Sequence, residues 1–299
     1  MKKLTKAIVA IMLTVAVICA AGCKKASKIY NVSVSASPSV GGVVSRGGNY
    51  EEGQSCTVTA MANDGYLFVE WTESGNVVST NANYTFSVTD NRNLLASFMR
   101  DCEYVDLGLP SGTLWATCNV GATTPEGYGN YYAWGETTTK PYSYNWNTYE
   151  YCNRSGWALT KYCNFSSYGN YGFTDNLTTL QISDDAARAN WGGDWRMPTK
   201  AEWEELLNNT TVTWTIQNFV YGRKFTASNG NSLFLPGAGC WDGEFDDAGS
   251  YGYYWSSSLY TDYPNTAWYL YFYSRSYSMN CKYRYCGGSV RAVLPASKN

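Results

Sequence analysis

The sequence predicts an α+β fold, with a small all-β module at the N-terminal side of a larger domain that has two short helices and small antiparallel sheets. Two observations lead to this prediction. Two capped helix signals lie close together in the second half of the chain, and alternating strand patterns with glycine-rich turns fill most of the remainder. The sequence pattern changes near residue 100, and a chain of this length is long for a single hydrophobic core, so we expect two modules.

The clearest helix signal begins at Thr199. Thr199 is the expected N-cap, and Glu202 completes a capping box in which each side chain satisfies a free backbone N–H. Pro198 prevents a helix from continuing in from upstream. One face of the helix is apolar and is expected to be buried, and it consists of Trp203, Leu206 and Leu207.

A second short helix is predicted over residues 183–190. Ser183 is its expected cap, and Gly192 is its expected stop. Asp184 and Asp185 would favour the positive end of the helix dipole.

Residues 29–100 show the pattern of β-strands. The segments 32–36, 56–60 and 84–88 each alternate apolar and polar side chains, as half-buried strands do. Glycine and asparagine pairs between these segments are typical of turns. We therefore expect a small all-β module here.

This module resembles the divergent internalin B-repeat family of bacterial surface proteins. The resemblance rests on the strand order, on the Gly-x-x-Phe-x-x-Trp spacing that ends at Trp71, and on a closing strand at 94–98. The family implies a stalk or spacer without chemistry of its own. Phe68 and Trp71 are accordingly expected in the core.

Residues 101–299 contain a series of blocks in a characteristic order. These blocks are residues 104–122, 131–136, 195–199, 233–239, 252–258 and 289–293. They closely resemble the Fibrobacter succinogenes major paralogous domain, which belongs with the C-type-lectin-like fold of the formylglycine-generating group. The resemblance implies two helices flanking short, mostly antiparallel sheets, with long irregular loops on one face. Independently, residues 267–273 alternate apolar side chains with tyrosines, as a half-buried strand should.

The N-terminus has the pattern of a secretion signal. Three early lysines precede an apolar run of signal-peptide length that is too short for a comfortable membrane span. The run ends in Ala-Ala-Gly-Cys23, which resembles the lipobox of bacterial lipoproteins. We expect residues 1–22 to be a signal peptide, Cys23 to be lipidated and residues 23–28 to be a tether. The alternative is ordinary secretion with cleavage near Ala21.

The residue after the expected lipid site favours the outer membrane. Lys24 is not the Asp that retains lipoproteins in the inner membrane of many Gram-negative bacteria. The tether also lacks the acidic run that some bacteria use for surface export. The cell surface and the periplasmic face both stay open as locations.

Composition excludes several classes of function. The expected signal contains three of the 22 basic residues, so 19 basic residues remain against 24 acidic ones, a net charge near −5. No basic stripe is present, so a nucleic-acid partner is not expected. The chain has no histidine. This lowers the expectation of an enzyme, since histidine is the commonest general base and metal ligand, and no cofactor or metal is expected.

Eight cysteines remain after removal of the signal and lipidation of Cys23. An even number in an oxidising compartment predicts disulfides, and short loops favour Cys281–Cys286 and Cys152–Cys163. Cys56 belongs to the separate β module. At least one downstream thiol is therefore unpaired unless a bridge crosses between the modules.

An aromatic-rich insertion over residues 142–151 is the first candidate binding surface. Tyr144, Trp146 and Tyr149 present flat apolar faces with polar tips, which suits stacking on sugar rings or contact with a protein partner. The alternative interpretation is that these rings pack the loop onto its own domain.

An acidic loop over residues 240–247 is the second candidate. Asp242 and Asp246 are predicted to be secondary polar contacts to a ligand. The loop has enough charge for Ca²⁺, but it lacks the EF-hand spacing and the signatures of sugar-binding calcium lectins. A solvated loop is the favoured alternative.

The cysteine pair Cys281 and Cys286 is the third candidate. It encloses Tyr-Arg-Tyr and resembles the copper-binding pair of formylglycine-generating oxidases. The pair directly abuts the strand at 287–293, without the intervening segment of those oxidases. A hairpin disulfide is therefore the favoured interpretation.

Together these patterns predict an outer-membrane-anchored lipoprotein that displays a non-enzymatic recognition domain for a glycan or protein ligand. One alternative is a structural envelope or fimbria-associated subunit, whose loops are assembly surfaces. The other is a copper-dependent oxidase of the formylglycine-generating type.

Overall fold

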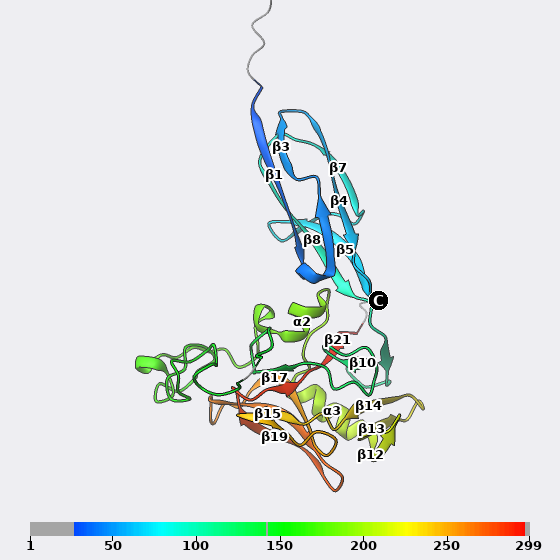
Figure 1. The fold of residues 1–299 in the computed structure, drawn as a ribbon, viewed down its shortest axis with the longest axis vertical. Helices are drawn as coiled ribbons and strands as arrows, with labels where there is room; N and C mark the ends of the chain where they lie inside the picture. Colours follow the sequence, from blue (N-terminus) through cyan, green and yellow to red (C-terminus); the bar gives the residue numbers. More distant parts are fainter. Residues whose placement is uncertain (1–26, 142, 297–299) are drawn as a thin grey trace, which may run out of the picture.

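The computed structural model describes residues 27–141 and 143–296. The expected signal peptide and the lipidation site Cys23 lie outside the described residues. Two modules follow one another along the long axis of the molecule, and the N-terminal one is built of strands with a short 3₁₀ turn, Ser39–Gly41 (Figure 1). Within the described part of the chain, no helix has the length and apolar character needed to cross a membrane.

The N-terminal module consists of two packed sheets. The first has the order β3-β1-β8-β5-β6 and the second has the order β2-β4-β7. Its strands are β1 Ile29–Ser37, β2 Gly42–Ser45, β3 Gly48–Glu51, β4 Ser55–Ala62, β5 Tyr66–Glu73, β6 Asn76–Ser79, β7 Asn83–Ser87 and β8 Arg92–Arg100. The three predicted strand segments lie in β1, β4 and β7, so these predictions are confirmed.

The core of this module forms around Trp71, which is completely buried. Its indole N–H donates to the Ala82 carbonyl at 3.2 Å, so the buried polar atom has a partner. Phe68 packs against it with ring centroids 6.1 Å apart. Both aromatic residues therefore contribute to the core as expected.

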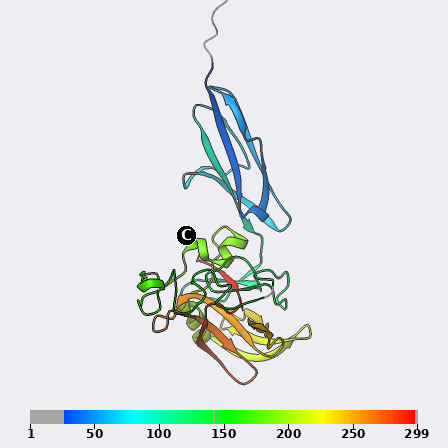
Figure 2. The same ribbon diagram turned by 60° about the vertical axis from the view of Figure 1, so that its left-hand side comes forward.

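The C-terminal module has an α+β architecture with four small sheets. Their orders are β21-β10-β9, β11-β20-β17-β18-β19, β12-β13-β14 and β15-β16. The strands are β9 Tyr104–Asp106, β10 Leu114–Asn119, β11 Tyr131–Tyr132, β12 Thr210–Gln217, β13 Val220–Ala227, β14 Ser232–Pro236, β15 Cys240–Asp242, β16 Glu244–Asp246, β17 Gly252–Leu259, β18 Thr266–Phe272, β19 Tyr277–Tyr283, β20 Gly288–Ser289 and β21 Arg291–Leu294. Its helices are α2 Ala186–Trp191 and α3 Lys200–Asn209. Figure 2 shows the same arrangement from a second direction.

Helix α3 begins as the sequence predicts. The Thr199 hydroxyl accepts from the Glu202 backbone N–H, and the Glu202 carboxylate accepts from the Thr199 N–H at 2.8 Å. Trp203 and Leu206 are fully buried, while Leu207 is partly buried. The capping box and the buried face are thus confirmed.

Helix α2 begins later than the sequence predicts. Asp185, and not Ser183, is the N-cap, because its Oδ1 accepts from the Ala187 and Arg188 backbone N–H groups. Ser183 lies in a separate 3₁₀ turn, Ile182–Asp184. The second oxygen of Asp185 accepts from the Met197 backbone N–H at 2.8 Å, so a distant segment holds this side chain at the helix start.

Strand β18 is confirmed, but its two faces are less distinct than predicted. Leu270 and Phe272 are fully buried, whereas Trp268 is partly exposed. Tyr269 is also buried, because Trp255 and other rings cover the second face of the sheet.

The two modules touch through β8 and the turn after α2. Gly192 has a φ of 66°, and a Cβ there would lie 2.0 Å from the Phe98 carbonyl oxygen. The Tyr66 hydroxyl donates to the Asn190 carbonyl at 2.9 Å. Gly192 therefore ends α2, as predicted, and also permits close approach of the two modules.

Candidate functional site

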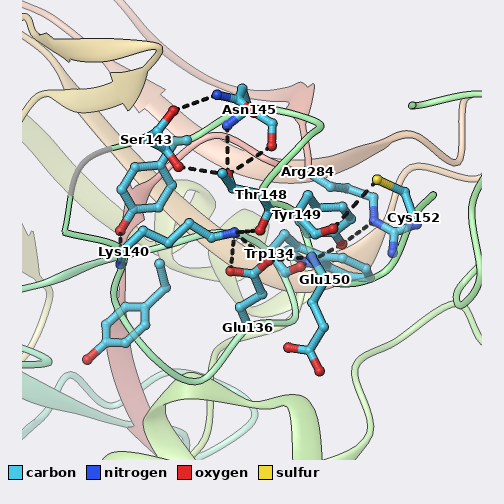
Figure 3. A network of polar contacts seen from close by, with 12 residues as sticks. Trp134, Glu136, Lys140, Ser143, Asn145, Thr148, Tyr149, Glu150, Cys152 and Arg284 are labelled. Atoms are coloured by element: carbon cyan, nitrogen blue, oxygen red, sulfur yellow. Dashed lines mark hydrogen bonds and ion pairs between the residues drawn. The ribbon is translucent and has the colours of Figure 1, made fainter. Parts of the chain in front are cut away.

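The loop that contains the predicted aromatic surface is folded onto its own domain (Figure 3). The Lys140 ammonium donates to the Glu136 carboxylate at 2.7 Å and to the Thr148 carbonyl at 2.6 Å. Only 13% of the Lys140 side chain and 5% of the Glu136 side chain are exposed. This nearly buried ion pair ties the loop to the segment that follows β11.

Tyr144 and Tyr149 are structural residues of this loop. They are 1% and 3% exposed. The Tyr144 hydroxyl donates to the Tyr131 carbonyl at 2.6 Å, and the Tyr149 hydroxyl donates to the Trp134 carbonyl at 2.8 Å. A buried ring offers no face to a ligand, so the prediction that these two tyrosines form a stacking surface is wrong. Both tyrosine hydroxyls donate to backbone carbonyls, so the side chains can be buried completely.

Arg284 anchors the loop through hydrogen bonds, and the sequence did not indicate this role. It is fully buried and donates to the Tyr149 hydroxyl at 2.8 Å. It also donates to three backbone carbonyls, those of Lys161, Tyr162 and Pro264, at 2.9–3.1 Å. Its guanidinium lies over the Trp134 ring, 5.0 Å from the centroid. The only sequence signal was its place in Tyr-Arg-Tyr between two cysteines.

Trp146 lies between the buried part of the loop and the surface. It is partly buried, and its ring meets those of Tyr149, Tyr283 and Tyr285 edge-on with centroids 4.9–5.8 Å apart. The structure therefore places Trp146 as a support for neighbouring rings.

Replacing Trp146 by alanine is expected to lower the free energy of unfolding by about 2 kcal/mol, since a large partly buried ring leaves a cavity. Urea unfolding followed by far-UV circular dichroism measures this change. A change below about 0.5 kcal/mol would show that the ring contributes no packing.

An exposed hollow lies beside this loop, and we call it the aromatic hollow. Its volume is about 540 Å³, and it is lined by Trp157, Tyr168, Asp242, Tyr263, Asn265, Thr266, Tyr269, Cys281, Lys282 and Tyr283. Three lining rings are largely open to solvent: Trp157 is 62% exposed, Tyr263 is 55% exposed and Tyr283 is 48% exposed. Large exposed aromatic side chains gathered at one hollow are typical of a binding surface.

The exposed rings are held in position by other rings. Trp157 stacks on buried Tyr168, with centroids 4.4 Å apart and planes inclined by 20°. Tyr283 stacks on Tyr285 with centroids 5.7 Å apart. Trp157 and Tyr283 thus each have one face supported by a neighbouring ring, which leaves the other face for a ligand.

Polar groups lie in the same hollow. Asp242 accepts from the Lys282 ammonium at 2.9 Å and from the Tyr285 hydroxyl at 2.8 Å. Partial burial alone would raise the pKa of Asp242, but the hydrogen bonds from Lys282 and Tyr285 lower it below its usual value. The carboxylate is therefore ionised at neutral pH and can accept hydrogen bonds from a hydroxyl-rich ligand.

The acidic loop forms a short hairpin, β15–β16, in which Asp242 pairs with Glu244 and Asp246 pairs with Cys240. Asp242 lines the aromatic hollow, whereas Asp246 is exposed and does not line it. Across residues 27–141 and 143–296, no three His, Cys, Asp or Glu side chains are grouped as they would be around a metal ion.

The two predicted local disulfides are absent from the structure. The Cys152 thiol donates to the Trp146 carbonyl at 3.2 Å, and the Cys163 thiol donates to the Phe165 carbonyl at 3.2 Å. These thiols are therefore partnered by different backbone carbonyls. Their closeness in sequence was not enough to form a disulfide in this structure.

Cys281 and Cys286 are also both free. Cys281 lines the aromatic hollow, while Cys286 lies beside Cys240 in a small space within the domain. The predicted hairpin disulfide between Cys281 and Cys286 is therefore wrong for this structure.

Comparison with known proteins concerns the N-terminal module. Residues 32–102 match the divergent InlB B-repeat domain. This match confirms the resemblance inferred from the strand order and from the spacing that ends at Trp71. The resemblance of residues 101–299 to the Fibrobacter paralogous domain is not confirmed. No curated protein and no solved structure matches the chain.

Proposed function

We propose that this protein is a lipid-anchored recognition protein that binds a glycan, without catalysis, in the aromatic hollow. The observation that carries the proposal is the presence of exposed aromatic faces and ionised polar groups around one hollow. Tyr and Trp rings suit the apolar faces of sugars, while carboxylate, amide and ammonium groups suit their hydroxyls.

The volume of the hollow supports a small, largely exposed ligand. Ligand sites commonly occupy ~300–1,000 Å³, and the hollow has about 540 Å³. Tyr168 and Tyr285 hold the exposed rings in place before a ligand arrives, so little side-chain entropy is lost on binding. A protein ligand is the alternative, and binding experiments separate the two.

The N-terminal module fits the role of a spacer in this proposal. The InlB B-repeat match indicates a surface-type domain. Strand β1 begins at the end of that module far from the C-terminal module (Figure 1). Lipidation at Cys23 would then leave the recognition domain standing away from an outer membrane. The lectin-like resemblance of residues 101–299 agrees with recognition through loops on one face.

Binding to an array of bacterial and host oligosaccharides, followed by calorimetry on the best glycan, tests the proposal. Trp157→Ala is expected to weaken affinity about tenfold, equal to about 1.4 kcal/mol, because it removes one stacking face. Phe219→Ala is the matched control, since Phe219 is 97% exposed but lies in the turn between β12 and β13, away from the hollow.

Binding is also expected to persist in EDTA, since the proposal needs no metal ion. Equal affinity of the Trp157 and Phe219 variants would contradict the proposed site. Failure to bind any glycan, together with co-purification of one fixed envelope protein, would favour the structural-subunit alternative.

A further inference from the structure

Two cysteines meet where the β9–β10 ladder reaches the junction of the modules. The pairs 106–114, 105–115 and 104–116 define an antiparallel register, and the same register places Cys102 opposite Cys118. Cys102 lies in the short connection after β8. The two Sγ atoms are 3.4 Å apart.

The backbone hydrogen bonds show which kind of cross-strand pair this is. The Thr117 N–H donates to the Glu103 carbonyl at 2.9 Å, so residues 103 and 117 form a hydrogen-bonded pair. Because such pairs alternate along an antiparallel ladder, Cys102 and Cys118 occupy a non-hydrogen-bonded position. Side chains approach most closely there, with Cα atoms ~4.5 Å apart, a separation that a disulfide can span.

The surroundings of Cys118 favour a thiolate. Arg291 is completely buried beside it, without a carboxylate partner, and its Nη2 has no hydrogen-bond partner within the described residues. A hydrogen bond from Cys102, followed by the positive charges of Arg291 and Arg100, lowers the pKa of Cys118 to about 7. The same hydrogen bond, together with burial, raises the pKa of Cys102. Only one of the two sulfurs therefore holds its proton firmly.

We propose that Cys102 and Cys118 are an oxidisable pair that forms a disulfide and locks the connection between the two modules. The oxidant is an external disulfide. The Cys118 thiolate attacks one oxidant sulfur, and the other oxidant sulfur leaves as a thiolate. Cys102 then loses its proton, attacks Cys118 Sγ and expels the second oxidant sulfur. Two cysteines lose two electrons and two protons, and the oxidant becomes two thiols.

The position of the bond gives it a structural consequence. Cys102 follows Arg100, the last residue of β8, whose carbonyl accepts from the Trp195 indole N–H at 3.2 Å. A disulfide would fasten the chain two residues beyond the N-terminal module to β10 of the C-terminal module. The segment that joins the two modules would thereby lose freedom to move relative to β10.

The purified, fully reduced chain can be treated with oxidised glutathione at pH 8, alkylated and mapped by peptide mass spectrometry. The expected product carries a Cys102–Cys118 bond and is two mass units lighter than its reduced form, while the six other cysteines of the described residues are alkylated. Closure of this short loop is expected to raise the Tm by about 8 °C, and dithiothreitol should reverse the shift.

Matched variants distinguish the pair from general thiol chemistry. Cys102→Ser and Cys118→Ser should each lose both the linked peptide and the Tm shift, whereas Cys281→Ser should keep both. The mapping on the unsubstituted chain is independent of how the variants fold. Free or glutathionylated thiols at both positions, or a link to a different cysteine, would overturn the proposal.

Discussion

Replacing Arg284 by methionine is expected to lower the free energy of unfolding by about 4 kcal/mol. The guanidinium donates to one tyrosine hydroxyl and three backbone carbonyls while completely buried. Methionine has a similar length, so it removes the donors with little change in volume. The carbonyl groups that lose their donor would then have to be solvated or remain unpaired.

The loss should appear first in the loops that Arg284 joins. Residues 143–162 should lose amide protection in hydrogen exchange, because Tyr149 and the backbone near Lys161 share this donor. Arg275→Met is the matched control, since Arg275 is exposed in the turn between β18 and β19. The free energy of unfolding of Arg275→Met should differ from that of the unsubstituted chain by no more than about 0.5 kcal/mol. Equal effects of the two variants would show that Arg284 is not a structural anchor.

Replacing Lys140 by methionine is expected to lower the free energy of unfolding by about 3 kcal/mol at pH 8. The substitution leaves the Glu136 carboxylate nearly buried without its cation, and among the described residues only the Glu150 backbone N–H still donates to it, at 2.8 Å. The double variant Lys140→Met with Glu136→Gln should recover part of the loss, because it removes the unpaired charge. No recovery would indicate that Lys140 acts through packing alone. Chemical unfolding of the unsubstituted chain and of these two variants makes the comparison.

The effect of Lys140→Met should depend on pH in a defined direction. Burial already raises the pKa of Glu136, and loss of Lys140 removes the attraction that opposes this shift. A carboxyl whose folded pKa is raised favours folding when protonated, so its penalty disappears as the pH falls through the folded pKa toward 4.5. The stability difference from the unsubstituted chain should therefore be smaller at pH 5 than at pH 8. A difference that grows toward pH 5 would contradict this origin.

Local patterns were sufficient for much of the fold. The capping box at Thr199 and Glu202 involves residues three apart, so it forms whenever the chain turns into a helix at that point. The alternation of apolar and polar residues also predicted β1, β4 and β7, since one face of each strand must be buried. The sequence placed the α2 cap at Ser183, whereas Asp185 is the cap and is held there by the Met197 N–H, 12 residues away.

Local sequence patterns did not locate the proposed binding surface. Tyrosine, tryptophan and phenylalanine make up 16% of the chain, so an aromatic cluster by itself does not separate core from surface. Tyr144 and Tyr149 became core because carbonyls of Tyr131 and Trp134 satisfied their hydroxyls. Trp157 stayed exposed although its local sequence carries no distinguishing pattern.

The sequence by itself determined the elements that depend on near neighbours: the two short helices, the alternating strands and the B-repeat module around Trp71. Only the tertiary structure decided which rings face solvent, which carboxylate lies beside them and which cysteines meet. Arg284 contacts Tyr149 across 135 positions, and Cys102 reaches Cys118 only through the β9–β10 register. Burial and sulfur pairing depend on distant segments brought together by folding, and no short stretch of sequence specifies them.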